Sequence, residues 1–533
     1  MCMFEVIPKI IKKYLAIIII ALSCILVWYK TLNQIFMGEG YSYFDPIFNL
    51  LPNGNFATLW RMDNFARLLF DIFPSIFRDN ISYYLAFQFL VLVILTTVFF
   101  YFVKYFTKNS WIGFGAAIIF GTSYLGLFEM IGTGNYQRFS QRIPNIIPEI
   151  LALLELVKYF DTKKIKYYVY SLVLFFISVF MGHFSTFLLP VFVIYPVIFS
   201  IVNKSGIAKL VKSVLFSIPF VLINRFLLSR DFYTPSGNFI GFIKEVGVGK
   251  IISLITLQFS NMLIPPFLVE KVASITSSYE GILIILTVPI LIIFLTGIYL
   301  VTKRKQKNLL IVYLVSIFSI PVLLFLNLYL RKVDPFYNMR GYTYYFLPRM
   351  YSINPSLTAT VKGDRYYMLP YLFVAIILSI LIYIVFNKKL SRSTKNPNSL
   401  SYKTAAGIFL TFYVAYNTFL VWTNINKIQP VSEDLKKYLS YIKSVSSRIN
   451  NQSVVVIPRE FLWPSSMIKA IYGYPDMKFA SNDTDWKKQI TNKKDLVLID
   501  FYYDQTKDGK INVAQNRVID LTDWANYNLP SNE

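Results

Sequence analysis

Two carboxylates that follow the first apolar run are candidates for acid–base chemistry. Glu39 and Asp45 lie in Met37-Gly-Glu-Gly-Tyr-Ser-Tyr-Phe-Asp45, just beyond an apolar stretch that ends near residue 33. A carboxylate at a membrane surface can accept a proton as a general base or orient a sugar hydroxyl. Acidic loop residues are also commonly solvated or cap a helix, so the pattern leaves a structural role open.

A pair of arginines is suited to an anionic ligand. Arg138 and Arg142 are four residues apart and share a face if the segment is helical. The guanidinium fork matches a phosphate, although anionic lipid headgroups would bind the same pair. Glu149 follows, one turn into the apolar segment 145–160. An acidic residue in a membrane segment is costly and usually has a partner or a function.

A basic and aromatic segment spans residues 331–365. Aromatic faces suit sugar rings, and arginines suit a phosphate or pyrophosphate. An aromatic belt with headgroup-binding arginines would have the same composition. Three of its residues are kept as candidate substrate-binding residues: Tyr345, Arg349 and Arg365.

The sequence offers little for metal or redox chemistry. His183 is the only histidine, expected at the outer end of a helical hairpin, where it could hydrogen-bond a substrate or simply be a satisfied polar residue. Cys2 and Cys24 are the only cysteines, which excludes a disulfide framework and Cys- or His-based metal sites. We expect no cofactor, and a divalent metal held by carboxylates stays open.

The elements that position these residues are membrane helices. The chain of 533 residues is 55% hydrophobic and 15% charged, whereas soluble proteins carry roughly 25% charged residues. Lys9, Lys12 and Lys13 precede the first apolar run without a cleavage site, which indicates an uncleaved first helix. We predict about eleven transmembrane helices, near residues 14–33, 82–103, 111–128, 145–160, 167–182, 184–202, 211–228, 281–301, 309–330, 366–386 and 404–423.

Charge placement orients these helices. The loops that would face inside are strongly basic and are opposed only by Glu5 and Asp161, whereas the first outer loop has more acidic than basic residues. The positive-inside rule therefore predicts a multi-pass cell-membrane protein with a cytoplasmic N-terminus. The net charge of +24 lies in short loops between apolar runs, so we expect the lipid bilayer as partner and no nucleic acid.

Two domains follow from this topology. Residues 1–424 form the transmembrane domain, with long outer loops at 34–80, 229–280 and 331–365. The residues from Phe56 to Phe77 predict an interfacial amphipathic helix. Residues 425–533 read as a small extracytoplasmic α/β domain, with a helix over Ser432–Asn450, strands at Val454–Ile457, Leu496–Ile499 and Arg517–Leu521, and a helix at 465–472.

This layout resembles the GT-C superfamily of membrane glycosyltransferases. The shared features are an acidic loop directly after the first helix, an interfacial helix, many helices and an outer C-terminal domain. The resemblance implies transfer of a hexose or pentose from a polyprenyl-phosphate-linked donor to a glycan, lipid or protein acceptor in the cell envelope. It assigns catalysis to Glu39 or Asp45, with inversion at the sugar carbon, and neutralisation of the leaving phosphate to Arg138, Arg142, Arg349 and Arg365.

Three other functions fit the same sequence. The first is a transporter or flippase for lipid-linked sugars, which the few intramembrane charges disfavour, chiefly Glu149, Glu155 and Arg225. The second is a polysaccharide polymerase or ligase, which shares the donor. The third is a membrane protein without catalytic activity. The sequence has no P-loop, so ATP-driven transport by this chain alone is not expected.

Overall fold

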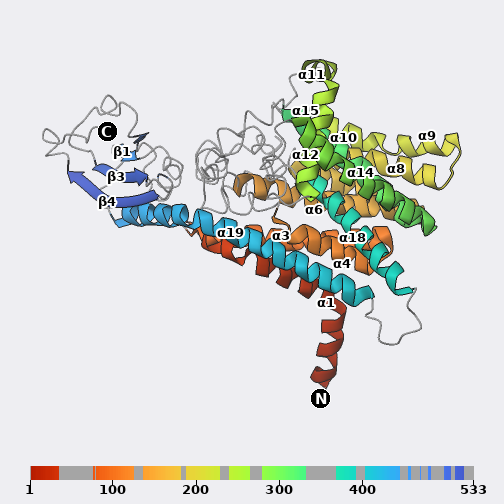
Figure 1. Cartoon of the computed structure of the whole chain (residues 1–533), viewed down its shortest axis with the longest axis horizontal. Helices are drawn as coiled ribbons and strands as arrows, with labels where there is room; N and C mark the ends of the chain where they lie inside the picture. The colour runs from red at the N-terminus through yellow and green to blue at the C-terminus, as the bar shows by residue number, and fades with distance from the viewer. Residues whose placement is uncertain are drawn as a thin grey trace.

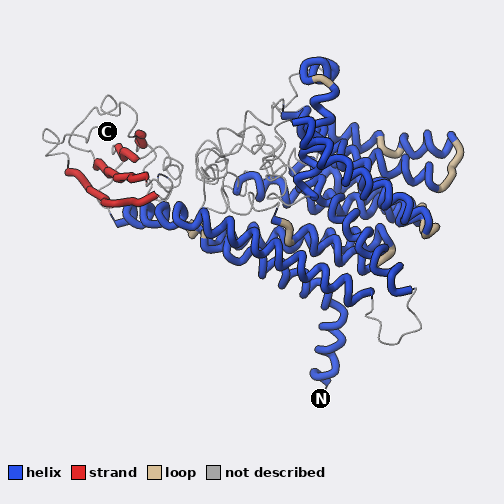
Figure 2. Tube along the Cα trace, in the orientation of Figure 1, coloured by secondary structure: helices blue, strands red, loops and turns tan. Residues whose placement is uncertain are grey.

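The computed structural model describes residues 2–34, 76–78, 80–124, 136–181, 188–228, 239–263, 279–331, 368–391, 402–444, 454–457, 469, 478–481, 497–505 and 511–520. The helices form one packed body, and the strands gather at the far end of a single long helix (Figures 1 and 2). Each apolar segment that predicts a transmembrane helix overlaps a helix in its described part. The chain is a polytopic α-helical membrane protein.

The helical body comprises α1 (Cys2–Trp28) with η1 (Tyr29–Asn33), α3 (Ile81–Thr107), α4 (Ser110–Gly121), α6 (Tyr136–Thr162), α7 (Ile165–Met181), α8 (Leu189–Val202), α9 (Ile207–Leu215), α10 (Ile218–Leu228), α14 (Tyr279–Lys303), α15 (Lys307–Arg331), α18 (Met368–Ser391) and α19 (Tyr402–Ser444). Within the described residues, 6 helical stretches are long and apolar enough to cross a membrane. The count of about eleven spans stays a prediction.

The predicted outer loops differ in how much is described. The predicted loop 229–280 contains two helices, α11 (Phe239–Val246) and α12 (Val248–Leu263), and α12 packs against α14 and α15. The expected interfacial helix at 56–77 lies outside the described residues except for Ile76 and Phe77, which are helical. The predicted long outer loop 229–280 therefore contains helices in its described part, and its position outside the membrane stays a prediction.

Helix α4 ends earlier than its apolar run suggests. The run continues to residue 128, but the helix has 12 residues and ends at Gly121, a length of about 18 Å. It begins with a cap, because the Asn109 side chain accepts hydrogen bonds from the backbone N–H groups of Trp111 and Ile112. An α-helix of this length does not cross a hydrocarbon core of about 30 Å.

Helix α4 binds its neighbours through its own backbone. The indole nitrogen of Trp28, on α1, donates to the carbonyl of Gly121 at 2.9 Å. A side chain at Gly121 would lie 2.7 Å from Thr96 Cγ2 on α3 and 2.9 Å from Cys24 Sγ on α1. Glycine is therefore required where α1, α3 and α4 meet, as is typical of close helix packing in membranes.

Two further helices donate to the same backbone. Ser379 on α18 donates to the carbonyl of Ile112 at 2.7 Å, and Tyr413 on α19 donates to the carbonyl of Ile119 at 3.2 Å. Side-chain hydroxyls that reach main-chain carbonyls are satisfied without water, which is what a membrane interior demands. Helix α4 is consequently the shared partner of α1, α3, α18 and α19.

The basic turns of the molecule gather at one end of the bundle. An ion pair joins Lys108, after α3, to Asp161, near the end of α6. Lys163, in the α6–α7 turn, lies 5.2 Å from the ring centre of Phe199, near the end of α8. The turn between α14 and α15 shares a cavity with Lys108. We call this the basic end; the charge pattern predicts that it is cytoplasmic.

These turns share a backbone device. The residue that reverses the chain has a left-handed φ between +52° and +59°, and it is a lysine in each of four turns: Lys108, Lys163, Lys204 and Lys305. This conformation costs a non-glycine residue roughly 1–2 kcal/mol. A cation at a helix C-terminus offsets part of that cost, because it faces the negative end of the helix dipole. The lysines therefore close the turns and also supply the topological charge.

Helix α19 carries the chain away from the basic end. The sequence predicts separate helices over 404–423 and Ser432–Asn450, but α19 is continuous for 43 residues. Beyond it, β1 (Val454–Ile457) pairs in parallel with β2 (Lys478–Ser481), and β3 (Val497–Gln505) pairs antiparallel with β4 (Ile511–Asp520). Strands thus lie where Val454–Ile457 and Leu496–Ile499 predict them. The strands lie at the far end, opposite the basic end (Figure 1).

We expect Gly121→Ala to destabilise the protein by about 1–3 kcal/mol, because the added Cβ would overlap Thr96 and Cys24. Gly407→Ala on α19 is the control, since nothing lies within 4 Å of an added Cβ there. Thermal unfolding in detergent, followed by size-exclusion chromatography, measures both variants. Equal melting temperatures for the two variants would contradict the role assigned to Gly121.

Candidate functional site

Most of the candidate residues fall where the structure gives no description. Glu39, Asp45, His183, Tyr345, Arg349 and Arg365 lie outside the described residues, and their roles stay predictions. The remaining candidates, Arg138, Arg142 and Glu149, all lie on α6. The structure therefore describes the helix that carries this group of candidates, and their roles stay predictions.

Helix α6 carries these candidates on a single face. It begins at Tyr136, nine residues before the predicted apolar segment, so both arginines are helical. Arg138, Arg142, Asn145 and Glu149 follow one another at spacings of four, three and four residues, which aligns them along a helix. We call these four residues the α6 stripe. Since α6 ends at the basic end, its arginines belong to the far end of the helix.

The inner half of the stripe is buried and unpaired. Glu149 is 0% exposed and Asn145 is 2% exposed. Both carboxylate oxygens of Glu149 and the amide nitrogen of Asn145 lack a hydrogen-bond partner, and so do both polar atoms of Gln88 on α3. A buried polar group left unpaired costs about 1–3 kcal/mol. Such a cost inside a membrane bundle marks a functional or water-filled position.

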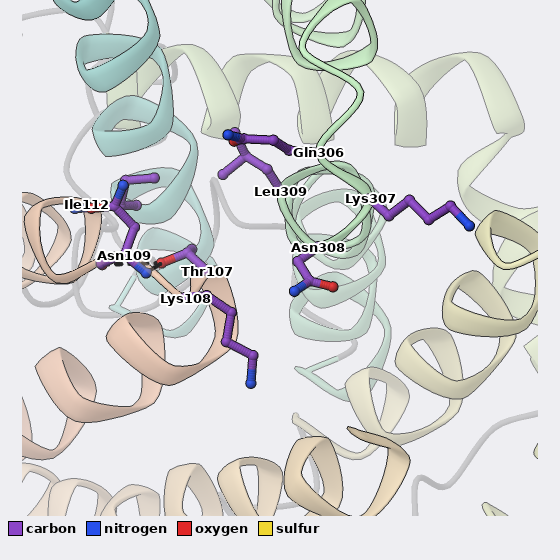
Figure 3. A pocket seen from close by; sticks show the side chains of 8 residues that line it. All are labelled: Thr107, Lys108, Asn109, Ile112, Gln306, Lys307, Asn308 and Leu309. Carbon is purple, nitrogen blue, oxygen red and sulfur yellow. Dashed lines mark hydrogen bonds between the residues drawn. The ribbon is translucent and has the colours of Figure 1, made fainter. Parts of the chain in front are cut away.

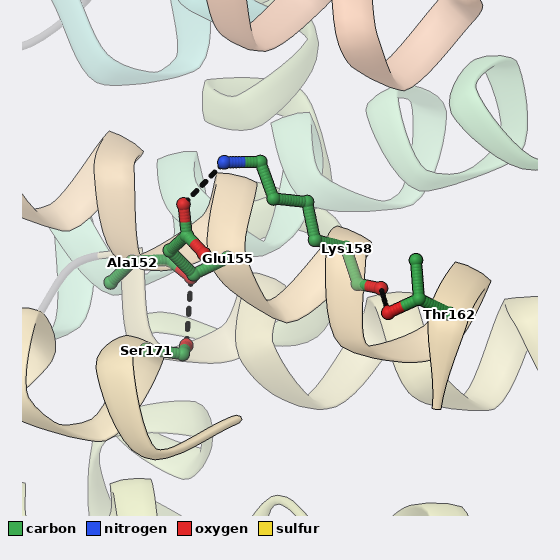
Figure 4. A network of polar contacts seen from close by, with 5 residues as sticks. All are labelled: Ala152, Glu155, Lys158, Thr162 and Ser171. Atoms are coloured by element: carbon green, nitrogen blue, oxygen red, sulfur yellow. Dashed lines mark hydrogen bonds and ion pairs between the residues drawn. The ribbon is translucent and has the colours of Figure 1, made fainter. Parts of the chain in front are cut away.

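A second acidic residue of α6, Glu155, differs from Glu149 in its contacts. Glu155 pairs with Lys158, one turn closer to the basic end, and Thr162 donates to the Lys158 carbonyl (Figure 4). Glu155 therefore has a cationic partner at one oxygen, although its Oε2 has no hydrogen-bond partner, whereas Glu149 has a partner at neither oxygen. Of these two acidic residues of α6, Glu149 is the one without a cationic partner.

Helix α7 holds the stripe in place through two serines. Ser178 donates to the Asn145 carbonyl and Ser171 donates to the Ala152 carbonyl, each at 2.7 Å. The serines are seven residues apart, and so are their acceptors, so α6 and α7 run antiparallel in fixed register. Figure 4 shows the contact of Ser171 with Ala152. The hairpin fixes the rotation of α6 and hence the direction of the stripe.

Glu149 lies deep in the bundle. It precedes Asp161 by about twelve residues, or roughly 18 Å along the helix. Thr96 precedes Lys108 by the same distance on α3, and the ion pair between Lys108 and Asp161 sets the two helices in register. Thr96 in turn borders Gly121, where α4 ends. Glu149 therefore lies at about the depth at which α4 stops.

The end of α4 is satisfied by polar groups from two other helices. The backbone N–H of Tyr124 donates to Asn417 on α19 at 2.8 Å. The hydroxyls of Tyr371 and Tyr413 lie 2.6 Å apart, and Tyr413 also reaches the Ile119 carbonyl. Irregular backbone at membrane depth is tolerated where protein surrounds it, as here. These side chains satisfy backbone groups at the end of the helix.

A cavity of about 360 Å³ lies at the basic end instead (Figure 3). It separates the α3–α4 turn from the start of α15, and its polar lining consists of Thr107, Lys108, Asn109, Gln306, Lys307 and Asn308. None of the candidate residues borders it. Its position at the end opposite the α6 arginines separates it from the candidate site.

The sequence candidates did not include every buried polar residue that lacks a hydrogen-bond partner in the structure. Gln88 and Asn145 lie within apolar segments, where an uncharged polar residue has little effect on hydropathy. Their burial without partners is visible only in three dimensions. Among the described residues, no three His, Cys, Asp or Glu side chains gather to hold a metal ion.

No protein-family model matches the chain, and no curated protein matches it. Among solved structures, the Archaeoglobus fulgidus oligosaccharyltransferase in its apo form is similar, with 12% identity, a TM-score of 0.42, and coverage of 89% of this chain and 65% of that one. The chain thus spans somewhat less than two thirds of that enzyme. The same enzyme tethered to an acceptor peptide gives a TM-score of 0.43 at 12% identity, with 98% and 75% covered.

ArnT from Cupriavidus metallidurans bound to undecaprenyl phosphate is also similar, with 11% identity, a TM-score of 0.40, and coverage of 95% of this chain and 97% of that one. At these scores the likeness is loose, and the chemistry of this chain has to be argued from its own residues.

We expect Glu149→Leu to raise the free energy of unfolding by about 1 kcal/mol, because it removes a buried carboxyl group that has no partner. Glu155→Leu on the same helix is the control and lowers stability, because Lys158 loses its ion pair. Melting temperatures of the two variants in one detergent measure the difference. A loss of stability in Glu149→Leu would mean that the carboxyl group is structural.

Proposed function

We propose that this chain is a membrane glycosyltransferase that moves a sugar from a polyprenyl-phosphate-linked donor to an acceptor on the extracytoplasmic face. The observation that carries the proposal is the α6 stripe: two arginines on the far half of a membrane helix, followed inward by Asn145 and Glu149. In a lipid-linked donor the phosphate lies at the membrane surface and the polyprenyl chain lies among the helices. Such a donor needs cationic side chains near the surface and uncharged surroundings deeper in the membrane.

The proposed reaction is a direct displacement. The acceptor hydroxyl oxygen attacks the anomeric carbon, and the bond from that carbon to the phosphate oxygen breaks. The bonding electrons leave with the polyprenyl phosphate, and the hydroxyl proton passes to the carboxylate of Asp45 or Glu39. Attack from the face opposite the leaving phosphate inverts the configuration at the sugar carbon.

The arginines would stabilise the negative charge of the leaving phosphate. Charge develops on the phosphate as it leaves, and fixed guanidinium groups stabilise that charge more in the transition state than in the bound donor. Arg138 and Arg142 are assigned this role, together with Arg349 and Arg365. His183 and Tyr345 are assigned to the sugar, as a hydrogen-bonding group and an aromatic face.

Glu149 has a distinct place in this scheme. It is the innermost member of the α6 stripe and has no exposed surface. A donor can touch it only if the helices separate around the lipid chain. We therefore assign Glu149 to donor binding in an opened state, in which its carboxyl group gains the polar partner that it lacks in the closed bundle.

A flippase for lipid-linked sugars is the second candidate, and the short helix α4 favours it. A helix that ends about 18 Å into the bilayer, beside buried unpaired polar groups, is a feature of carriers. The two functions separate in vesicles, because a flippase moves the donor across the bilayer without an acceptor, whereas a glycosyltransferase releases polyprenyl phosphate. A polymerase or ligase differs from our proposal only in the acceptor.

We expect Asp45→Asn or Glu39→Gln to lower transfer by about 100-fold or more, because a general base contributes a factor of this size. The assay measures release of polyprenyl phosphate from a polyprenyl-phosphate-linked sugar in vesicles that contain the purified protein. Glu433→Gln, an exposed change on the far part of α19, is the control and should retain activity. Full activity in both loop variants would refute the catalytic assignment.

We expect Arg142→Gln to lower kcat more than it raises KM for the donor, because the lost interaction strengthens as the phosphate leaves. Arg225→Gln on α10 is the matched arginine control and should leave both constants unchanged. An equal effect of the two variants would indicate a general loss of positive charge, and an unchanged kcat in Arg142→Gln would remove this arginine from the mechanism.

A further inference from the structure

Three lysines at the basic end come together on neighbouring turns. Lys163 follows α6, and Lys209 and Lys212 lie three residues apart in the first turns of α9. Within the described part of the chain, none of the three forms an ion pair. We call Lys163, Lys209 and Lys212 the lysine cluster.

Packing holds these turns side by side. The hydroxyls of Ser200 on α8 and Ser213 on α9 lie 2.6 Å apart, which joins the two helices next to their turn. The ammonium group of Lys163 lies 4.9 Å from the ring centre of Phe160 and 5.2 Å from that of Phe199. The ammonium group of Lys163 thus lies within cation–π distance of aromatic rings from both α6 and α8, although the residue as a whole is exposed.

The cluster has more positive charge than its surroundings neutralise. Burial lowers the pKa of Lys163, Asp161 raises it, and the charges of Lys209 and Lys212 lower it further. Asp161 already pairs with Lys108. Like charges that converge on a partly desolvated site repel one another, and an anion bound between them would relieve the repulsion.

The cluster also lies at the edge of the hydrocarbon layer. The stretch Ile207–Leu227 is apolar enough to cross a membrane, and Lys209 and Lys212 lie in its first turns. Ile207, Val211 and Leu215 in the same turns are 81%, 51% and 54% exposed. Apolar side chains this exposed belong in contact with lipid chains, so the lysines beside them lie at headgroup level.

We propose that the lysine cluster binds the phosphate of an anionic phospholipid in the leaflet at the basic end. The apolar surface of α9 favours a lipid over a soluble anion, because the acyl chains can lie along Ile207, Val211 and Leu215 while the headgroup phosphate meets the lysines. The site lies at the end of the bundle opposite the α6 arginines, so it is separate from the proposed site of glycosyl transfer.

The test compares two double variants of the full-length protein, each with two positive charges removed from the basic end. In Lys209→Gln/Lys212→Gln the cluster loses two cations, and in Lys303→Gln/Lys305→Gln the charges are lost at the α14–α15 turn. The proteins are reconstituted in phosphatidylcholine vesicles with increasing phosphatidylglycerol. Native mass spectrometry counts retained phosphatidylglycerol, and thermal unfolding gives the melting temperature.

We expect the wild type and the α14–α15 variant to retain phosphatidylglycerol and to melt at higher temperature as its fraction rises. The cluster variant should retain at least about tenfold less phosphatidylglycerol, because each lysine near an anionic membrane surface adds to the binding free energy of the lipid. Lys209→Arg/Lys212→Arg, which keeps both charges, should restore retention and shows that loss of binding does not come from misfolding.

Three results would overturn the proposal. Equal loss in both charge-removing variants would mean a general electrostatic attraction without a site. Unchanged retention in the cluster variant would mean that the lipid binds elsewhere. The third result is a rise in melting temperature with inorganic phosphate in pure phosphatidylcholine that is as large as the rise with phosphatidylglycerol. That result would mean that the cluster binds a soluble anion.

Discussion

The backbone of α4 is the structural centre on which the other helices depend. Its carbonyls accept hydrogen bonds from Trp28 on α1, Ser379 on α18 and Tyr413 on α19, and Gly121 lets α1 and α3 approach within contact distance. In lipid, burial of apolar surface gives helices little reason to associate, so close packing and such hydrogen bonds must hold them together. A side chain at Gly121 would separate the helices and weaken several of these bonds at once.

The shortness of α4 has a second consequence, because it brings a polar layer into the middle of the bundle. The chain leaves the helix at Gly121, and side chains of α1 and α19 satisfy the backbone groups exposed there. Glu149 lies at about the same depth but remains unpaired. The fold therefore compensates the polar groups that its own geometry creates, and the carboxyl group of Glu149 is one that it leaves uncompensated. That difference distinguishes a structural cluster from a candidate site.

Much of the helical architecture follows from hydropathy, since a run of apolar residues has few alternatives to a helix in a membrane. The start of α6 at Tyr136 was not predictable in this way, because Arg138 and Arg142 lower the hydropathy while occupying only one face. The continuity of α19 past residue 424 was missed for a similar reason: its outer part is polar and needs no lipid. Burial of Gln88 and Asn145 depends on which neighbours surround them, which no local pattern contains. The roles of Glu39 and Asp45 rest on sequence alone.

The two ends of the bundle use different cations, and the physical properties of the side chains explain why. At the basic end, lysines lie in left-handed turns after helices, where a flexible point charge can turn back to face the carbonyls of the last turn. At the far end, Arg138 and Arg142 lie within a helix, one turn apart, where a planar fork can meet a phosphate in two places. Lysines that close turns are free to bind an anion only where nearby carboxylates do not fully neutralise them. Lys108 pairs with Asp161, and that carboxylate also acts on Lys163, but the charges of Lys209 and Lys212 act on Lys163 as well. The same turn chemistry therefore produces a neutralised contact in one place and the proposed anion site in the next.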